Sequence, residues 1–382
     1  MRPRLIFLFS DTGGGHRAAA EAVSRAMETA YPGRFDIDLI DPFVQGGRPL
    51  VRWLVYRYSW LIKHMPKTYG LVFHGTDNRM AVRAAVRSFG RQLRPGINRS
   101  VEERPPAAIV SFHPLTNHVT IQVLDKLGLD VPFVTVITDM TDVHRFWITR
   151  RADIVVVPSL EARRLSISKG LDPRRVHVVG LPVNPRFHGP LHGPQKAALR
   201  QRLRLSNEPT LLLVSGAEGS GRLRAQARAL DRAGLGLQLL VVCGRNQRLQ
   251  ARLEKETWKG NVHVYGFVDN MPELMQASDA VVTKAGPGTI SEALISGLPL
   301  FLTGFVPGQE EGNVKFVTDQ RVGYYTPQVR KLVKAIRHSF VEDRPQFDRM
   351  QGHAEAVGRT DAAAEIAQLI AAAVDPAPVL PY

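Results

Sequence analysis

The sequence predicts an α/β protein of two domains, each built around a parallel β-sheet. Its 382 residues exceed the usual size of one domain, and 44% of them are hydrophobic, which is enough for two cores. Short apolar runs alternate along the chain with segments long enough to form crossover helices, and this alternation is typical of parallel sheets. The alternation breaks near residues 180–194 and then resumes, which indicates a domain boundary there.

Each predicted domain contains five strands, defined by its apolar runs. In the first domain they are Leu5 to Phe9, Asp36 to Ile40, Ala108 to Ser111, Phe133 to Ile137 and Ile154 to Val157. In the second they are Leu211 to Val214, Leu237 to Val242, Val262 to Tyr265, Ala280 to Thr283 and Pro299 to Leu302. We therefore expect two Rossmann-like domains, residues 1–180 and 195–345, that bind ligands beyond the carboxyl ends of their strands.

Two further segments complete the predicted chain. Residues 181–194 contain prolines, glycines and basic side chains and fit neither a helical nor a strand period. They are the expected linker. Thr360-Asp361 is expected to cap an alanine-rich helix that runs to Ala373.

The most informative stretch is a glycine-rich turn at residues 283–292, Thr-Lys-Ala-Gly-Pro-Gly-Thr-Ile-Ser-Glu. It lies between an apolar run and a helical pattern, so the first N–H groups of the helix converge at the positive end of the helix dipole. Such an end is a phosphate site. Glu292 lies about one turn further on, where its carboxylate can accept two hydrogen bonds from a ribose diol. The alternative is an ordinary turn whose glycines allow tight packing.

A second polar cluster, Gly-Gln-Glu-Glu-Gly-Asn at residues 308–313, follows the next strand. Several hydrogen-bonding side chains between two glycines suit the hydroxyl groups of a sugar, and the alternative is a solvated loop. Together with the turn at 283–292, the cluster favours a nucleotide-sugar ligand.

Three motifs carry a family resemblance: residues 10–16 (Ser-Asp-Thr-Gly-Gly-Gly-His), 283–292 and 308–313. In this order they resemble the monogalactosyldiacylglycerol synthase and diacylglycerol glucosyltransferase family, and the resemblance runs from residue 4 to about residue 325. The chain is similar, more distantly, to the transferase that adds N-acetylglucosamine to the lipid-linked peptidoglycan precursor. The resemblance implies the GT-B glycosyltransferase fold, in which two Rossmann-like domains face a cleft. It also implies a last helix, within residues 346–382, that packs back on the first domain.

In the second domain the resemblance implies a UDP-sugar site. Gly216 lies in a loop that matches the family's glycine-rich loop only loosely, and Arg245 can neutralise a diphosphate or be an ordinary surface arginine. Phe267 and Val268 align with the loop that offers backbone hydrogen bonds to uracil in this fold, although Phe267 can also serve packing. The residues expected to bind the donor are Gly216, Arg245, Phe267, Val268, Lys284, Gly286, Gly288, Thr289, Glu292, Gln309 and Glu310.

The acceptor is expected at the strand ends of the first domain. Gly14 and Gly15 allow close approach, and His16 can take a proton from an acceptor hydroxyl because histidine titrates near neutrality. Asp139 is the alternative base, or the group that orients a histidine, and His113 lies at another strand end within reach of an acceptor. Taken singly, His16 would be a capping or surface histidine and Asp139 a turn residue.

No metal and no cofactor are expected beyond the UDP-hexose donor. Asp36-Ile37-Asp38 has the Asp-x-Asp spacing of metal-dependent glycosyltransferases, but it lies inside a strand pattern, far in sequence from the nucleotide motifs. A helix N-terminus can stabilise a leaving diphosphate without a cation.

The composition suits an enzyme that meets an anionic surface. A net charge of +15 implies acidic lipid or nucleic acid as a partner, and no nucleic-acid motif supports the latter. Cys243 is the single cysteine, which argues for a reducing compartment. No apolar run is long enough for a membrane span, and the N-terminus is a poor signal peptide. We expect a peripheral protein on the cytoplasmic face of the cell membrane.

Residues 42–76 are the expected membrane contact, since they contain no Asp or Glu. As a helix this segment has a narrow polar stripe and a broad apolar face that includes Trp53 and Trp60, although Arg57 falls opposite the stripe. The alternative is a core helix with one wet edge.

The expected function is transfer of glucose or galactose from a UDP-sugar to diacylglycerol with inversion. A UDP-sugar epimerase and a non-catalytic, membrane-bound UDP-sugar-binding protein are the alternatives.

Overall fold

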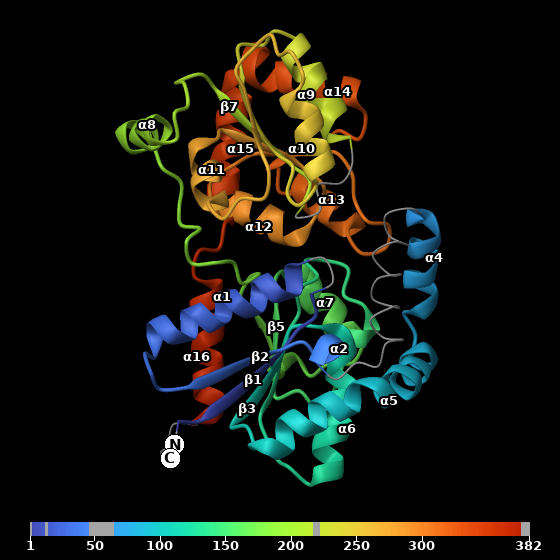
Figure 1. Cartoon of the computed structure of the whole chain (residues 1–382). Helices are drawn as coiled ribbons and strands as arrows, with labels where there is room; N and C mark the ends of the chain where they lie inside the picture. The colour runs from blue at the N-terminus through green and yellow to red at the C-terminus, as the bar shows by residue number, and fades with distance from the viewer. Residues whose placement is uncertain (1, 12–13, 46–64, 217–221, 376–382) are drawn as a thin grey trace. The chain divides into compact units, whose positions relative to one another are not determined.

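The computed structural model describes residues 2–11, 14–45, 65–216 and 222–375, and it divides into two compact units. The first unit comprises residues 1–185, 306–310 and 361–382, and the second comprises residues 186–305 and 311–360. Each unit contains a six-stranded parallel sheet (Figure 1).

The sheet of the first unit has the strand order β2-β1-β3-β4-β5-β6. The order changes direction between β1 and β3: β2 is added on one side of β1, and β3 to β6 are added on the other. The strands are β1 (Arg4–Leu8), β2 (Asp36–Ile40), β3 (Ala108–Ser111), β4 (Phe133–Val136), β5 (Ile154–Val157) and β6 (Val176–Val178).

Helices cover both faces of this sheet. All five residues of β1 are buried, because alternate side chains enter opposite cores: Leu5 and Phe7 one core, Ile6 and Leu8 the other. The core that contains Leu5 is closed by α1 and α16, which lie side by side (Figure 1). The helices are α1 (Gly15–Ala30), α2 (Pro42–Gln45), α4 (Pro66–Thr76), α5 (Arg79–Glu103), α6 (Pro114–Leu127), α7 (Leu160–Ser168) and α16 (Ala362–Val374), with 3₁₀ turns η1 (Arg145–Trp147) and η2 (Pro173–Arg175).

The sheet of the second unit has the order β12-β11-β10-β7-β8-β9, which is the Rossmann arrangement. Its order changes direction between β7 and β10. The strands are β7 (Thr210–Val214), β8 (Gln238–Val242), β9 (Val262–Tyr265), β10 (Ala280–Thr283), β11 (Leu300–Leu302) and β12 (Gly323–Tyr325). The helices are α8 (Gly193–Arg202), α9 (Leu223–Arg232), α10 (Gln247–Glu254), α11 (Met271–Ala277), α12 (Pro287–Ile295), α13 (Glu311–Asp319), α14 (Val329–Arg337) and α15 (Arg344–Val357), with a π-helical turn η3 (His338–Glu342).

The observed sheets each contain one strand more than the sequence predicted. The additional strands, β6 and β12, have three residues each, too few to show a period. Backbone register identifies them: Val155 pairs with Val176, and Leu300 pairs with Gly323. Both are the last strand of their sheet in chain order and lie at an edge.

The segment boundaries also differ from those expected. The first unit continues to residue 185, inside the expected linker, and α8 begins at Gly193. The expected final segment, residues 346–382, is divided between the units. Helix α15 belongs to the second unit because Phe347 and Met350 are part of its core, whereas α16 belongs to the first. Asp361 does precede α16, but its side chain makes no capping hydrogen bond.

Most of the expected membrane segment, including Trp53 and Trp60, falls at residues 46–64, outside the described residues. Its described ends form α2 and α4. Among the described helices, none is long and apolar enough to cross a membrane.

Candidate active site

Two histidines meet at the point in the first sheet where the strand order changes direction. His16 lies in the first turn of α1, which follows β1, and His113 precedes α6, which follows β3. Their rings lie edge to face with centroids 4.7 Å apart. Gly14 lets the chain turn into α1, because its φ of 81° is in the left-handed region that glycine adopts without strain. Ligands bind at such switch points in open α/β sheets, so His16 lies where a ligand is expected.

Thr138, two residues after β4, positions the His16 ring. Its Oγ1 lies 2.8 Å from His16 Nδ1, at hydrogen-bonding distance. His113 is held differently: its Nδ1 accepts a hydrogen bond from the backbone N–H of Leu115 at 3.3 Å and so caps α6. Thr138 directly precedes Asp139, but its role was not predicted, because a single threonine after a strand has no distinguishing pattern.

Asp139, the alternative base, is held by a tryptophan. Trp147 is fully buried, and its indole Nε1–H donates to Asp139 Oδ2 at 2.6 Å. Gln309 Nε2 donates to Asp139 Oδ1 at 3.3 Å, within the first unit. The Trp147 ring centroid lies 6.1 Å from that of His16. The side chain bonded to His16 is therefore Thr138, and Asp139 is connected to His16 only through Trp147.

Burial sets the charge of these groups. Burial lowers the pKa of His16 to about 4, and a hydrogen bond with the backbone of Phe112 opposes this shift. Burial also lowers the pKa of His113 well below its ordinary value, and the neighbouring His16 adds to the effect. For Asp139, burial raises the pKa to about 6 against the hydrogen bonds from Trp147 and Gln309. At neutral pH both histidines are uncharged, and His16 has a lone pair that can accept a proton.

Asp41 supports the glycine-rich loop and was not identified from the sequence. Its Oδ2 accepts the backbone N–H of Asp11 at 3.0 Å, and its Oδ1 accepts that of Phe43 at 2.9 Å. The Phe43 ring in turn contacts His113, with centroids 5.0 Å apart. The signal available in the sequence was an acidic residue directly after the strand that ends at Ile40.

The second unit has a helix N-terminus at its own switch point. Helix α12 begins after β10 with Gly286 as N-cap and Pro287 at the first position, and Ile290 N–H bonds to Gly286. By helix geometry the N–H groups of Gly288 and Thr289 lack intrahelical acceptors, so they can bind an anion. An ideal Cβ on Gly288 would have no atom within 4 Å, which shows open space beside this turn.

The loops after β7 and β10 meet beside this helix end. Gly216 has a φ of 69°, which favours glycine, and an ideal Cβ there would lie 3.7 Å from Cε of Lys284. Behind the turn, Asn313 of α13 is fully buried and donates from Nδ2 to the carbonyl of Ala285 at 2.8 Å. Asn313 closes the polar cluster at residues 308–313 but was given no role from the sequence, and in the structure it fixes the turn.

The side chain of Glu292 has no hydrogen-bond partner among the described residues. Within the part of the chain that the structure describes, no hydrogen bond or ion pair reaches its side chain, and burial raises its pKa to about 8. A partly buried acid without donors is destabilising unless a ligand supplies them. Its place on the second turn of α12 suits a ligand whose phosphates occupy the helix N-terminus.

The remaining candidates fall into two groups. Arg245 lies with its guanidinium 5.2 Å from the ring of Phe267, and that ring is 62% exposed beside half-buried Val268. Residues 306–310 group with the first unit, where Gln309 accepts from Tyr69 at 3.1 Å. Buried Glu310 accepts from the backbone of Val306 at 2.8 Å, so one carboxylate oxygen is used to close its own loop.

Two other features lie away from these residues. Asp36 and Asp38, the Asp-x-Asp pair, form ion pairs at 2.6 Å with Arg104 and Arg4. Among the described residues, no cluster of three or more His, Cys, Asp or Glu is arranged to hold a metal ion.

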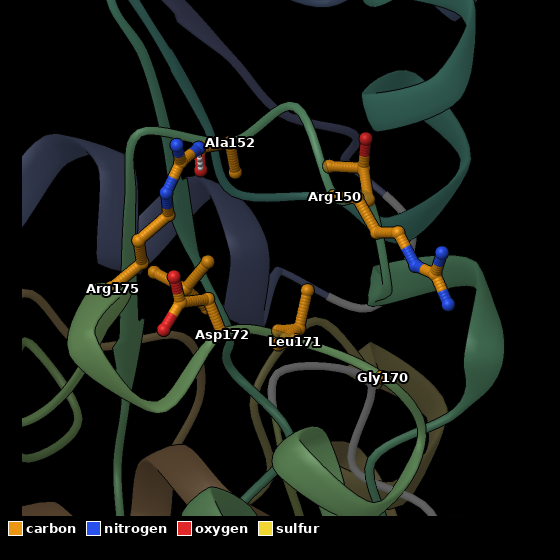
Figure 2. Close-up of a pocket in the computed structure, with 8 residues that line it drawn as sticks. Arg150, Ala152, Gly170, Leu171, Asp172 and Arg175 are labelled. Carbon is orange, nitrogen blue, oxygen red and sulfur yellow. Dashed lines mark hydrogen bonds between the residues drawn. The ribbon is translucent and has the colours of Figure 1, made fainter.

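A pocket in the first unit lies at the edge of the sheet opposite to His16 and His113. All its lining residues except Val155, which lies in β5, come shortly before β5 or β6, so the pocket is at the amino ends of these strands. Arg175 donates to the Ala152 carbonyl there at 3.0 Å (Figure 2). The switch-point histidines follow β1 and β3 and therefore lie at the opposite, carboxyl edge.

Solved structures support the fold. The S. aureus MnaA–UDP complex superposes with a TM-score of 0.62 at 13% identity and covers 100% of this chain and 99% of its own. MurG of Acinetobacter baumannii superposes with a TM-score of 0.61 at 14% identity, over 97% of this chain and 99% of its own. The chain therefore has the GT-B glycosyltransferase fold that its sequence predicted.

Sequence comparisons support the family. The profile described as monogalactosyldiacylglycerol (MGDG) synthase matches residues 16–183, and that of the glycosyltransferase family 28 C-terminal domain matches residues 210–369. Monogalactosyldiacylglycerol synthase of Spinacia oleracea is 35% identical over 95% of this chain and 71% of its own length. Monogalactosyldiacylglycerol synthase 3 of Arabidopsis thaliana is 35% identical over 95% of this chain and 79% of its own. The chain is a glycosyltransferase that belongs to the monogalactosyldiacylglycerol synthase family.

Proposed function

We propose that this enzyme transfers a hexose, galactose or glucose, from its UDP-sugar to 1,2-diacylglycerol and makes a membrane glycolipid. The observation that carries the proposal is the match to monogalactosyldiacylglycerol synthases over 95% of the chain. The two switch-point sites support it, because one offers a proton acceptor and the other an anion site with an unpaired carboxylate.

UDP is held by the second unit. The diphosphate binds to the N-terminus of α12, at Gly286, Gly288 and Thr289, and the ribose hydroxyls donate to Glu292. The positive end of the helix stabilises the negative charge that develops on the leaving diphosphate, so this step requires no cation. Gln309 and Glu310 orient the hexose, and Arg245 and Lys284 add positive charge near the phosphates.

His16 is the general base. A neutral His16 has one ring nitrogen without a proton, and the contact of Thr138 Oγ1 with Nδ1 orients the ring so that this lone pair takes the proton of the diacylglycerol hydroxyl. The hydroxyl oxygen bonds to the anomeric carbon as the bond from that carbon to the UDP oxygen breaks. Attack opposite to UDP inverts the anomeric centre. Asp139, ionised above pH 6, holds the indole of Trp147, whose ring lies beside that of His16.

The experiment uses the purified protein with labelled UDP-galactose and UDP-glucose, with and without liposomes that contain diacylglycerol. We expect labelled glycolipid only with diacylglycerol, and the preferred donor identifies the hexose. Interconversion of the sugar nucleotides without acceptor would identify an epimerase. UDP-sugar binding with neither product would identify a non-catalytic binding protein. Sedimentation of the protein with liposomes tests the proposed peripheral location on the cytoplasmic face of the membrane.

A further inference from the structure

Helix α5 carries a row of arginines that the proposed reaction does not use. Arg79, Arg83, Arg87 and Arg91 recur at intervals of four residues, and all four side chains are exposed. Because residues four apart lie one above another on a helix, the row extends over about 18 Å within an arc of about 120°. We call these four residues the α5 arginine row.

The row has no anionic partner within the described residues. No hydrogen bond or ion pair joins these four guanidinium groups to any described side chain. The nearby acid Asp77 is already occupied, since it accepts from Lys169 Nζ at 2.6 Å and from the backbone N–H of Arg145 at 2.8 Å. Residues 46–64, outside the description, contain no Asp or Glu in their sequence.

The row occupies a position that helix energetics disfavour. Like charges four residues apart repel each other, and positive charge near a helix N-terminus opposes the helix dipole. Opposite charges occur at this spacing elsewhere: Arg99 pairs with Glu103 at 2.7 Å in the same helix, and Arg344 with Asp348 at 2.8 Å in α15. Like charges at this spacing also occur, as in Arg224 and Arg228 of α9, but there Glu256 pairs with both. In α5 four such residues follow one another without an acid paired to them among the described residues, and an anionic partner would relieve both costs.

Exposed apolar side chains lie on α5 itself and on the helix before it. Met80 is 80% exposed and lies three residues before Arg83 and seven before Arg87, so it shares their side of the helix. Leu71 and Val72 of the preceding helix, α4, are 76% and 48% exposed. Six of the ten large hydrophobic side chains that are exposed in the described residues lie between residues 39 and 80. Exposed apolar side chains next to unpaired arginines suit the boundary between headgroups and acyl chains.

We propose that the α5 arginine row is a docking surface for the anionic phosphates of a lipid bilayer, with Met80 and the apolar side chains of α4 entering the headgroup boundary. A bilayer is favoured over nucleic acid because it accommodates the exposed apolar groups as well as the arginines. The inference rests on the proposed function in one respect, namely that the acceptor resides in a membrane. The row lies outside the proposed catalytic and UDP-binding residues.

The test compares two charge-matched triple variants. R83Q/R87Q/R91Q removes three charges from the row, and R232Q/R252Q/R337Q removes three exposed charges from helices α9, α10 and α14 of the second unit. Partitioning is measured on phosphatidylcholine vesicles with and without phosphatidylglycerol. We expect the row variant to lose roughly a hundredfold in partitioning to the acidic vesicles, and the control to lose severalfold at most. Thermal unfolding of the row variant should be unchanged or shifted upward, because the repulsion within α5 is removed.

Equal losses in the two variants would overturn the proposal, since net charge would then explain the binding. A row variant that loses binding to a labelled oligonucleotide, but not to acidic vesicles, would assign the surface to nucleic acid. UDP affinity and transfer to a short-chain diacylglycerol in neutral detergent micelles are measured in parallel, and both should persist in the row variant. If the wild-type protein shows no transfer but its vesicle binding depends on the row, the proposed function fails while the docking surface stands.

Discussion

The two units present opposite kinds of site at corresponding points of their sheets. At the switch point of the first, polar groups are paired with one another: His16 with Thr138, and Asp139 with Trp147. At the switch point of the second, Glu292 and the start of α12 have groups whose partners are not among the described residues. The first arrangement fixes the orientation and charge of a base before a substrate arrives. The second stays incomplete until a ligand supplies an anion and hydrogen-bond donors.

The largest expected effect follows from removal of the base in the first unit. His16→Ala should lower turnover by about a hundredfold or more, as expected for a lost general base, and leave UDP affinity intact. Steady-state kinetics and calorimetry with UDP measure the two quantities. Thr138→Val keeps the histidine but removes its Oγ1 contact and should cause a smaller loss in turnover. Turnover that survives in His16→Ala would transfer the role of base to Asp139.

The next effect tests the second unit. Glu292→Ala should weaken UDP binding by about 1.5 to 3 kcal/mol, the range for hydrogen bonds to a charged group. Because burial raises the pKa of Glu292 to about 8, its carboxyl is mostly protonated at pH 7 in the free protein. Ribose hydroxyls that donate to the carboxylate lower this pKa, so UDP binding at pH 7 should release protons. Calorimetry in buffers of different ionisation enthalpy measures this release. Unchanged UDP affinity in the variant would remove Glu292 from the ribose role.

The pH dependence of kcat/KM tests whether the reaction needs the carboxylate of Asp139 or only neutral His16. The two cases differ by about tenfold in kcat/KM at pH 5. With a pKa of about 4, His16 remains neutral and able to accept a proton down to that pH. With a pKa of about 6, Asp139 becomes protonated below pH 6, so a reaction that needs its carboxylate loses about tenfold per pH unit there. We expect an acid limb near pH 6, because the Asp139 carboxylate accepts from Trp147, whose ring lies beside that of His16. A profile level down to pH 4 would restrict Asp139 to a structural role.

Features set by local sequence patterns were predictable, whereas those set by long-range pairing were not. Long apolar runs such as the one over β1 predict a buried strand, and glycines followed by a helical period predict the start of α12, so the fold and the position of this helix were predictable. The three-residue strands β6 and β12 were not, because pairing with a neighbouring strand defines them. The same holds for Thr138, Trp147 and Asn313, whose roles depend on long-range hydrogen bonds. The boundary near residue 360 depends on whether α15 fills the second core, which residue composition does not reveal.

The smallest expected effect is that of an added methyl group at Gly288, where we expect a ligand, compared with Gly323, where the backbone is closely packed. At Gly288 an added Cβ would meet no atom within 4 Å, and an alanine in a helix gains about 0.5 to 1 kcal/mol over glycine. Gly288→Ala should therefore raise the unfolding temperature slightly or leave it unchanged, yet weaken UDP binding severalfold, because the methyl group crowds the phosphate position. At Gly323 an added Cβ would lie 2.0 Å from the carbonyl oxygen of Leu300 on β11, so Gly323→Ala should destabilise the fold. Thermal unfolding and UDP calorimetry on both variants give the contrast. If Gly288→Ala lowers stability and leaves UDP affinity unchanged, its glycine serves the fold, and the phosphates bind elsewhere than at the start of α12.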